Sequence, residues 1–152
     1  MLKYKIISKN AEETRALAAK IMSKLHIGDV VLLTGDLGAG KTTFVSGALS
    51  YSGYKDHVIS PTFNILKCYF EVNPTIYHID AYRLEDQNID IGLEEQIEGD
   101  GVCFIEWPKF IETLIPSKHL EVSLKRINDN EREIEVIDEC GSYKDLIKSL
   151  EA

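Results

Sequence analysis

Hydrophobic and polar positions along the chain follow two different periods, which predicts strands interleaved with helices. Leu17, Ile21 and Leu25 recur at the spacing of one helix face. Asn10 is a suitable N-cap for this helix, and Glu13 follows three residues later, as in a capping box. Helices are predicted at residues 10–26, 40–52, 89–101 and 142–150. Short apolar runs predict strands at residues 4–8, 29–35, 60–71, 75–82 and 102–106.

The last third of the chain has the pattern of a β-hairpin. Residues 119–127 and 131–138 alternate apolar and polar side chains on either side of a polar turn. Asn73-Pro74 marks another turn, between two predicted strands. Strands that alternate with helices indicate a three-layer α/β sandwich around a mostly parallel sheet, with helices on both faces and the hairpin at one edge. We expect one domain that spans residues 1–152.

Composition and charge narrow the range of possible functions. The net charge of −8 argues against a surface that lies on nucleic acid, because such surfaces use Lys and Arg to neutralise phosphates. The three cysteines include no C-x-x-C pair, which argues against a disulfide framework or a zinc site and favours a reducing compartment. The sequence has neither a leader pattern at its start nor an apolar run long enough for a membrane span. We therefore expect a cytoplasmic protein without membrane contact.

Residues 35–42, GDLGAGKT, match the phosphate-binding pattern G-x-x-x-x-G-K-[ST] in full. An apolar strand leads into this segment and a helical pattern leads out of it, as the pattern requires. The glycines let successive backbone N–H groups point at phosphate oxygens. Lys41 is then expected at the β- and γ-phosphates, and the Thr42 hydroxyl at Mg²⁺. A chance match in a glycine-rich turn is the alternative.

Two other predicted strands end on carboxylates, Asp80 and Glu106. Ligands of open α/β sheets bind beyond the carboxyl ends of the strands, so parallel neighbours would bring both residues to the phosphate loop. There they would hold Mg²⁺, order its waters or orient an attacking water. The alternative is that each carboxylate merely closes its strand and is solvated.

Three further polar residues lie near these strand ends. Thr62, which follows a Ser-Pro pair, either senses the γ-phosphate through Mg²⁺ or belongs to a plain turn. Arg83 either stabilises charge on the γ-phosphate or pairs with the acidic segment 85–98. His78 shares a strand face with Asp80, and we expect it to be a packed core histidine. The sequence has no N-K-x-D pattern for guanine, so ATP is the expected nucleotide.

Four segments carry a resemblance to a known family: GDLGAGKTTF at 35–44, SPTF at 60–63, HIDAYRL at 78–84 and GDGVCFIEWP at 99–108. Together they resemble the bacterial TsaE (YjeE-type) P-loop ATPases of tRNA threonylcarbamoyladenosine (t6A) biosynthesis. Their order and spacing fit this family over nearly the whole chain. The resemblance implies a P-loop NTPase fold, and an ATPase that binds ATP with Mg²⁺ and is weak alone.

The resemblance also implies partners. In this family, hydrolysis is faster with the TsaB–TsaD pair, which transfers the threonylcarbamoyl group to adenosine 37 of tRNA. The family member supports repeated turnover of that pair and does not carry out the transfer. Direct binding of tRNA is therefore not expected, which agrees with the acidic composition.

Site residues follow from the same resemblance. The expected metal ligands are Thr42, Asp80 and Glu106, with Asp80 acting on either Mg²⁺ or water. Thr62 looks like a switch residue, and Trp107 like a residue of the nucleotide site or of the partner face. The expected catalytic residues are Lys41, Thr62, Asp80 and Glu106. The expected nucleotide-binding residues are Ala11, Asp36, Leu37, Gly38, Ala39, Gly40, Lys41, Thr42, Thr43 and Trp107, with Ala11 near the adenine.

Two other functions compete with this one. A free-standing small-molecule kinase would also carry a complete phosphate loop on a small α/β domain. Such an enzyme usually has an arginine-rich lid, and the four arginines here form no cluster in the sequence. The other possibility is a nucleotide-dependent switch or scaffold without useful hydrolysis.

Overall fold

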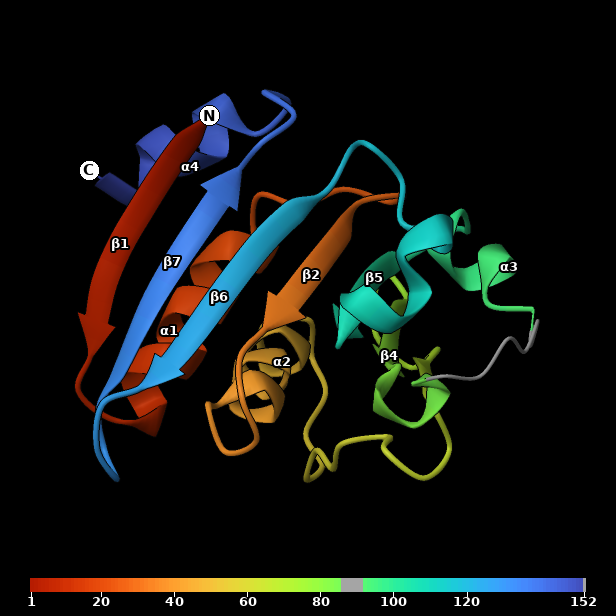
Figure 1. Ribbon diagram of the computed structural model, residues 1–152, viewed down its shortest axis with the longest axis horizontal. Coiled ribbons are helices and arrows are strands. Elements are labelled where there is room, and N and C mark those ends of the chain that lie inside the picture. The colour runs from red at the N-terminus through yellow and green to blue at the C-terminus, as the bar shows by residue number, and fades with distance from the viewer. Residues whose placement is uncertain (86–91, 152) are drawn as a thin grey trace.

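The computed structural model describes residues 1–85 and 92–151, and its centre is one mixed β-sheet (Figure 1). In these residues seven strands follow the order β1-β7-β6-β2-β5-β4-β3. They are β1 (Leu2–Ser8), β2 (Val30–Thr34), β3 (Leu66–Tyr69), β4 (Ile76–Asp80), β5 (Val102–Glu106), β6 (Leu120–Arg126) and β7 (Arg132–Asp138). β2 runs parallel to both β5 and β6, and β4 runs parallel to β5. β1, β7 and β3 make antiparallel pairs toward the two edges, so the predicted hairpin is confirmed as β6–β7.

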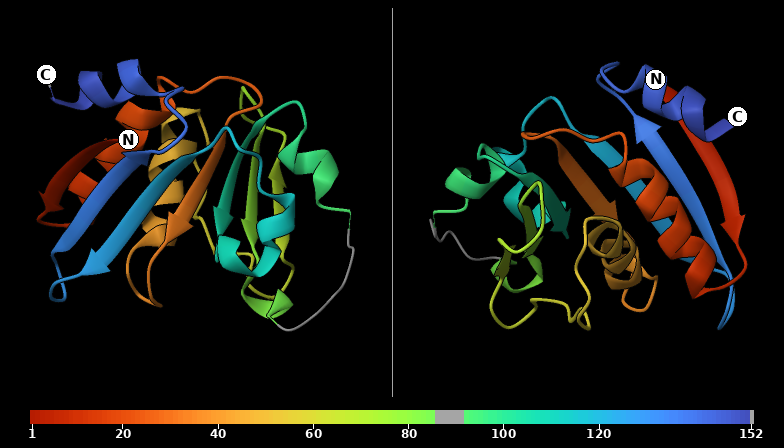
Figure 2. Two further views of the ribbon diagram at one scale, coloured as in Figure 1. Left: turned by 45° about the horizontal axis from the view of Figure 1, so that its top comes forward. Right: turned by 180° about the vertical axis from the view of Figure 1, so that it is seen from behind.

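Helices cover both faces of this sheet, as the sequence predicts, and Figure 2 shows the two sides. One face carries α1 (Ala11–Met22), α2 (Lys41–Tyr51) and α4 (Lys144–Glu151). The other face carries η1 (Tyr82–Leu84), α3 (Glu94–Ile97) and η2 (Pro108–Leu114). Each face has its own apolar core, and consecutive β2 residues alternate between them: Val31 packs in the first and Val30 in the second. None of these helices, within the described residues, is long and apolar enough to cross a membrane.

The covering of the two faces explains the sequence pattern of the strands. β2 and β5 lie between both cores, so their residues are apolar almost without interruption until the polar strand ends. β1 and β7 pack against the core on one face only, and their opposite face carries ion pairs. The Lys3 Nζ lies 3.8 Å from the Glu135 Oε2, and the Lys5 Nζ lies 3.0 Å from the Glu133 Oε1. This half-covered arrangement produces the alternation from which the hairpin was predicted.

The start of α1 confirms the predicted cap. The Asn10 side chain accepts a hydrogen bond from the Glu13 N–H at 2.9 Å, and the Glu13 carboxylate accepts one from the Lys9 N–H at 2.8 Å. The helix ends at Met22, earlier than predicted, although Leu25 is still buried in the turn that follows. This turn lets the chain reverse into β2.

Three elements differ from the prediction. The strand predicted at 60–71 is confined to β3, because Pro61 cannot donate to a strand ladder and Ile65 has a left-handed backbone with φ 69°. The helix predicted at 89–101 is the single turn α3 in the part that the structure describes, and residues 86–91 lie outside it. The pattern does not predict η2, which begins at Pro108, a residue suited to a first helical turn.

α1 and α2 pack so closely at Gly47 that this position has no room for a side chain. A Cβ there would lie 2.4 Å from the Arg15 carbonyl oxygen and 2.6 Å from the Arg15 Cα. We predict that Gly47→Ala lowers the free energy of unfolding by about 1–3 kcal/mol, the usual cost of overpacking. This cost should outweigh the better helix propensity of alanine. Urea denaturation followed by circular dichroism measures the change.

Ser50→Ala, at an exposed position of the same helix, is the matched control. Its free energy of unfolding should stay within about 0.5 kcal/mol of wild type. A Gly47→Ala protein as stable as this control would contradict the close approach of the two helices.

Candidate functional site

The phosphate loop, residues 35–42, joins β2 to α2 at the carboxyl edge of the parallel strands. Gly40, the N-cap of α2, has φ 103°, a backbone that L side chains rarely adopt. At Gly35 a Cβ would lie 2.4 Å from the carbonyl oxygen of Leu124 on β6. Both ends of the loop therefore require glycine. The first N–H groups of α2, and the positive end of its dipole, are available to an anion.

Lys41, the first residue of α2, is only 5% exposed. Its ammonium donates to the carbonyl oxygens of Gly35 and Asp36, at 3.4 Å in the second case. The ammonium also lies 4.2 Å from the centre of the Trp107 ring, within cation–π range. Burial lowers the pKa of Lys41 from its ordinary value of 10.5, and nearby carboxylates oppose that shift. The charge is thus held by its own loop, where a phosphate would be a stronger partner.

Asp80 and Glu106, at the ends of β4 and β5, lie side by side at the same edge. The register pairs Asp80 with Glu106, and Glu106 with Leu33 next to the end of β2. Each acidic residue is 3% exposed, so neither is merely a solvated strand end. A pocket of about 300 Å³ opens at this edge. It is lined by Leu37, Gly38, Ala39, Gly40, Lys41, Thr42, Thr43, Ser60, Thr62, Asp80, Glu106, Trp107 and Arg132.

Of the residues predicted for the site, two lie outside this lining. Ala11 is the first residue of α1, and Asp36 contributes its carbonyl oxygen to Lys41 but does not line the pocket. Arg83, for which the sequence left two roles open, also lies outside the lining, and its guanidinium stacks 5.3 Å from the centre of the Phe63 ring. The structure therefore brings together most of the predicted set, whose functional roles stay predictions.

Asp80 anchors the Ser-Pro-Thr turn to β4. Its Oδ2 accepts hydrogen bonds from the hydroxyls of Ser60 at 3.0 Å and Thr62 at 2.8 Å. Its Oδ1 accepts from the Tyr82 N–H at 3.0 Å, and its own N–H donates to the Ile65 carbonyl oxygen at 2.8 Å. An ionised carboxylate can accept several bonds at once, so Asp80 fixes the loop that borders the pocket. Thr62 thus lies in the pocket with its hydroxyl already bound to an acid.

His78 contacts Glu106, the second acid of the site. The sequence does not indicate this contact. Its side chain is fully buried, and its Nε2 lies 2.6 Å from the Glu106 Oε2. The other ring nitrogen, Nδ1, has no hydrogen-bond partner among residues 1–85 and 92–151. The expectation of a core histidine is correct for its burial, but incomplete for its chemistry.

Trp107 follows Glu106 in a left-handed backbone conformation, with φ 57° and ψ 50°. Such a conformation costs a non-glycine residue about 1–3 kcal/mol, and it occurs preferentially at functional sites. The ring packs against Tyr82 at a centroid distance of 5.1 Å and stacks on Phe110 at 6.1 Å. Residues of η1 and η2 therefore pack against the indole, and the Lys41 ammonium lies over its ring.

The donor set fits Mg²⁺ held together with a nucleotide. Thr42, Asp80 and Glu106 supply one hydroxyl and two carboxylates around the phosphate loop. Mg²⁺ is usually bound by one or two carboxylates, waters and substrate phosphates rather than by an all-protein cage. The described part of the chain has no cluster of three or more His, Cys, Asp or Glu side chains arranged for a metal ion.

Arg132, the first residue of β7, is a pocket residue that the sequence does not single out. Its guanidinium donates to the Gly38 carbonyl oxygen at 3.1 Å, and to the carbonyl oxygens of Asn128 and Glu131 at 2.7 and 2.9 Å. The β6–β7 turn thereby contacts the phosphate loop. Gly38 and Arg132 are 94 residues apart, and no motif connects them, so only the fold reveals this contact.

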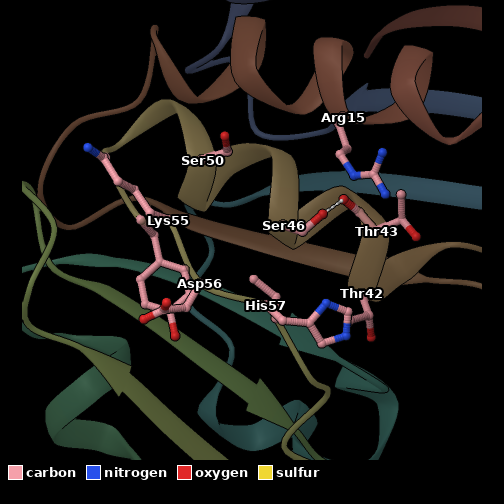
Figure 3. Close-up of a pocket in the computed structure, with 11 residues that line it drawn as sticks. Arg15, Thr42, Thr43, Ser46, Ser50, Lys55, Asp56 and His57 are labelled. Carbon is pink, nitrogen blue, oxygen red and sulfur yellow. Dashed lines mark hydrogen bonds between the residues drawn. The ribbon is translucent and has the colours of Figure 1, made fainter.

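A second, larger pocket of about 600 Å³ continues from the phosphate loop along α2 (Figure 3). It shares Thr42 and Thr43 with the phosphate pocket. Arg15 from α1 and Lys55 and His57 from the segment after α2 also line it, as Figure 3 shows. The two pockets therefore adjoin at the first turn of α2.

A strand, a glycine-rich loop and a helix with two acids at neighbouring strand ends define the P-loop class of α/β proteins. Comparison with known sequences identifies the family within this class. The profile of the family described as "Threonylcarbamoyl adenosine biosynthesis protein TsaE" matches residues 8–134. The chain belongs to this family.

Relatives in bacteria support this assignment over nearly the full length. The chain is 42% identical over 149 residues to the tRNA threonylcarbamoyladenosine biosynthesis protein TsaE of Bacillus subtilis, covering 98% of this chain and 93% of the relative. It is 38% identical to the protein of the same name from Treponema pallidum, covering 86% and 97%. The crystal structure of Bacillus subtilis YdiB superposes with a TM-score of 0.84 at 36% identity, covering 99% of this chain and 95% of that one.

The hydrogen bonds of Asp80 lead to a prediction about the loop before β3. Asp80→Ala removes the acceptor for Ser60, Thr62 and Tyr82, and bonds to a charged acceptor each contribute about 1.5–3 kcal/mol. We predict that amide hydrogen exchange in residues 59–65 becomes at least about 10-fold faster, because local opening then costs less free energy. Exchange followed by mass spectrometry measures this.

Asp100→Ala is the control, because Asp100 accepts a 2.7 Å hydrogen bond from the Tyr77 hydroxyl away from this loop. It should leave exchange at 59–65 unchanged. Unaltered exchange in the Asp80→Ala protein would mean that the turn holds itself without the acid.

Proposed function

We propose that the chain is an ATP-binding and ATP-hydrolysing subunit of tRNA threonylcarbamoyladenosine biosynthesis. One observation carries the proposal: the loop with Lys41 and Thr42 opens into the same pocket as the acids Asp80 and Glu106. A phosphate cradle beside two buried carboxylates is the arrangement that phosphoryl transfer to water requires. We propose one ATPase domain over residues 1–152, working in the cytoplasm.

In this proposal each group has a separate task. The loop N–H groups and the Lys41 ammonium bind the β- and γ-phosphates, which releases Lys41 from its present carbonyl partners. Thr42 and Glu106 hold Mg²⁺, and Asp80 either shares that ion or orients the attacking water. Mg²⁺ supplies neutralisation of the charge that develops on the phosphates. Thr62, which already donates to Asp80, couples the turn before β3 to the occupancy of the site.

The proposed partners are the TsaB–TsaD pair, with no direct contact to tRNA. The family assignment and the net charge of −8 support this, since an acidic chain suits a protein partner better than an RNA backbone. The bond network of Asp80 supports it too, because a partner that moves the 60–62 turn would also move the acid. In this proposal the pair stimulates hydrolysis by moving that turn and, with it, Asp80.

Lys41→Ala tests the nucleotide site. We predict that ATP binding weakens about 10- to 150-fold, because a hydrogen bond between charged groups contributes about 1.5–3 kcal/mol. Isothermal titration calorimetry measures the Kd, and thermal unfolding confirms that the domain remains folded. Lys109→Ala is the matched control, since the Lys109 ammonium is also near the Trp107 ring, at 5.5 Å, but does not line the phosphate pocket. Equal affinity in wild type and Lys41→Ala would show that the nucleotide binds elsewhere.

Phosphate release with and without partners tests the activity. We predict slow release by the chain alone, and a clear increase when the purified TsaB–TsaD pair is added in stoichiometric amounts. The increase should disappear in Asp80→Ala and Glu106→Ala, because these side chains line the phosphate pocket. No stimulation and no co-elution with the pair would rule out the subunit role. Transfer of labelled phosphate to a metabolite, rather than to water, would instead identify a kinase.

A further inference from the structure

The contact between His78 and Glu106 has no task in the function proposed above. Their Nε2 and Oε2 atoms are 2.6 Å apart, and the two side chains are 0% and 4% exposed. Removing an imidazole and a carboxylate from water is costly unless their hydrogen bond compensates for it. The packing of the core alone therefore does not explain why this buried pair is polar.

We infer that His78 is a positioning residue that orients Glu106 toward Mg²⁺, an inference that rests on the proposed Mg²⁺–ATP site. A carboxylate that holds Mg²⁺ only accepts hydrogen bonds, so in the Mg²⁺-bound site the shared hydrogen belongs to the histidine Nε2. This bond occupies Oε2 and fixes the plane of the carboxylate. Among the described residues no donor bonds to Oε1, which is left for a metal ion or its water in the pocket.

The unpaired nitrogen of His78 separates this role from simple packing. Nδ1 is buried without a hydrogen-bond partner in the described part of the chain, and an unsatisfied buried polar atom costs about 1–3 kcal/mol. A leucine would avoid that cost, but it would leave the Glu106 Oε2 without its hydrogen-bond partner. Among the described residues, the imidazole makes its polar contact with Glu106 alone. Any effect of the polar ring on the site therefore acts through Glu106.

The sheet register makes the contact possible. His78 on β4 lies opposite Phe104 on β5, two residues before Glu106, while Asp80 lies opposite Glu106 itself. Residues two apart on a strand share a face, so β4 presents His78 below Glu106 and Asp80 beside it. One strand therefore carries both an acid of the pocket and the support for the other acid. Metal-binding carboxylates are typically held by such outer hydrogen bonds, whose removal weakens metal binding about 10- to 100-fold.

Variants of His78 with and without a donor near the Nε2 position test this role. His78→Gln places an amide N–H near the position of Nε2, whereas His78→Asn ends one methylene short and His78→Leu has no donor. Calorimetry would follow binding of a non-hydrolysable ATP analogue over a range of Mg²⁺ concentrations, and also in EDTA. We expect His78→Asn and His78→Leu to need about 10- to 100-fold more Mg²⁺ for half-maximal enhancement. We expect His78→Gln to stay near wild type, and all variants to bind equally in EDTA.

Tyr77→Phe is the matched control. It removes a 2.7 Å hydrogen bond to Asp100 from the residue of β4 that precedes His78, whose side chain packs in the other core. Its Mg²⁺ dependence should equal that of wild type even if its melting temperature falls. The positioning role is overturned if His78→Asn keeps the wild-type Mg²⁺ dependence, or if Gln and Asn shift it equally. Parallel losses of binding with and without Mg²⁺ in all His78 variants would also overturn it, in favour of a purely structural role.

The same titration distinguishes the inference from the function on which it rests. If wild type shows no Mg²⁺-dependent binding of the analogue, the proposed ATPase site fails and the role of His78 fails with it. If wild type shows the dependence and the His78 variants share it, the ATPase site stands and only the positioning role fails.

Discussion

The parallel pairing of β2, β5 and β4 is the constraint on which the site depends. Their register places Leu33, Glu106 and Asp80 on one line across the sheet, one residue before the end of β2. Because side chains alternate along a strand, a slip of one residue would turn an acid toward the opposite core. The two apolar cores oppose such a slip, since it would exchange every buried residue of the moved strand between them.

Electrostatic balance is the second organising principle. The pocket contains two buried carboxylates and one buried ammonium, before any phosphate enters. Carboxylates at neighbouring strand ends repel each other and would repel a triphosphate, unless a cation lies between them. Mg²⁺ fits that requirement, and hydrogen bonds between the acids and Ser60, Thr62 and His78 compensate for the burial of the two carboxyl groups. The polar shell around the acids is thus as much a part of the site as the loop.

The sequence predicts those parts of the structure that depend on residues close together in the chain. The phosphate loop, the Asn10 cap and the alternation of the hairpin each depend on residues close in the chain, so their spacing predicted them. Strand-end logic also placed Asp80 and Glu106 at one edge, because both end apolar runs. The contacts that support the acids and the phosphate loop could not be predicted from the sequence. Those of His78 and Arg132 join residues that are 28 and 94 positions apart, and they depend on strand register and the path of a turn. The strand predicted at 60–71 is confined to Leu66–Tyr69, because the backbone before it turns at Pro61 and Ile65 and the turn is held by Asp80.

Trp107 has a consequence for how this protein can be observed. It is the sole tryptophan of the chain, and its ring has the Lys41 ammonium on one side and the aromatic rings of Tyr82 and Phe110 as neighbours. Indole emission depends on the charge and polarity around the ring, so whatever moves Lys41 alters the light that the chain emits. Because the chain has one indole, all of its tryptophan fluorescence reports on this one position. The protein thus contains its own optical reporter at the entrance to the phosphate pocket, with no background from other tryptophans and no need of a label.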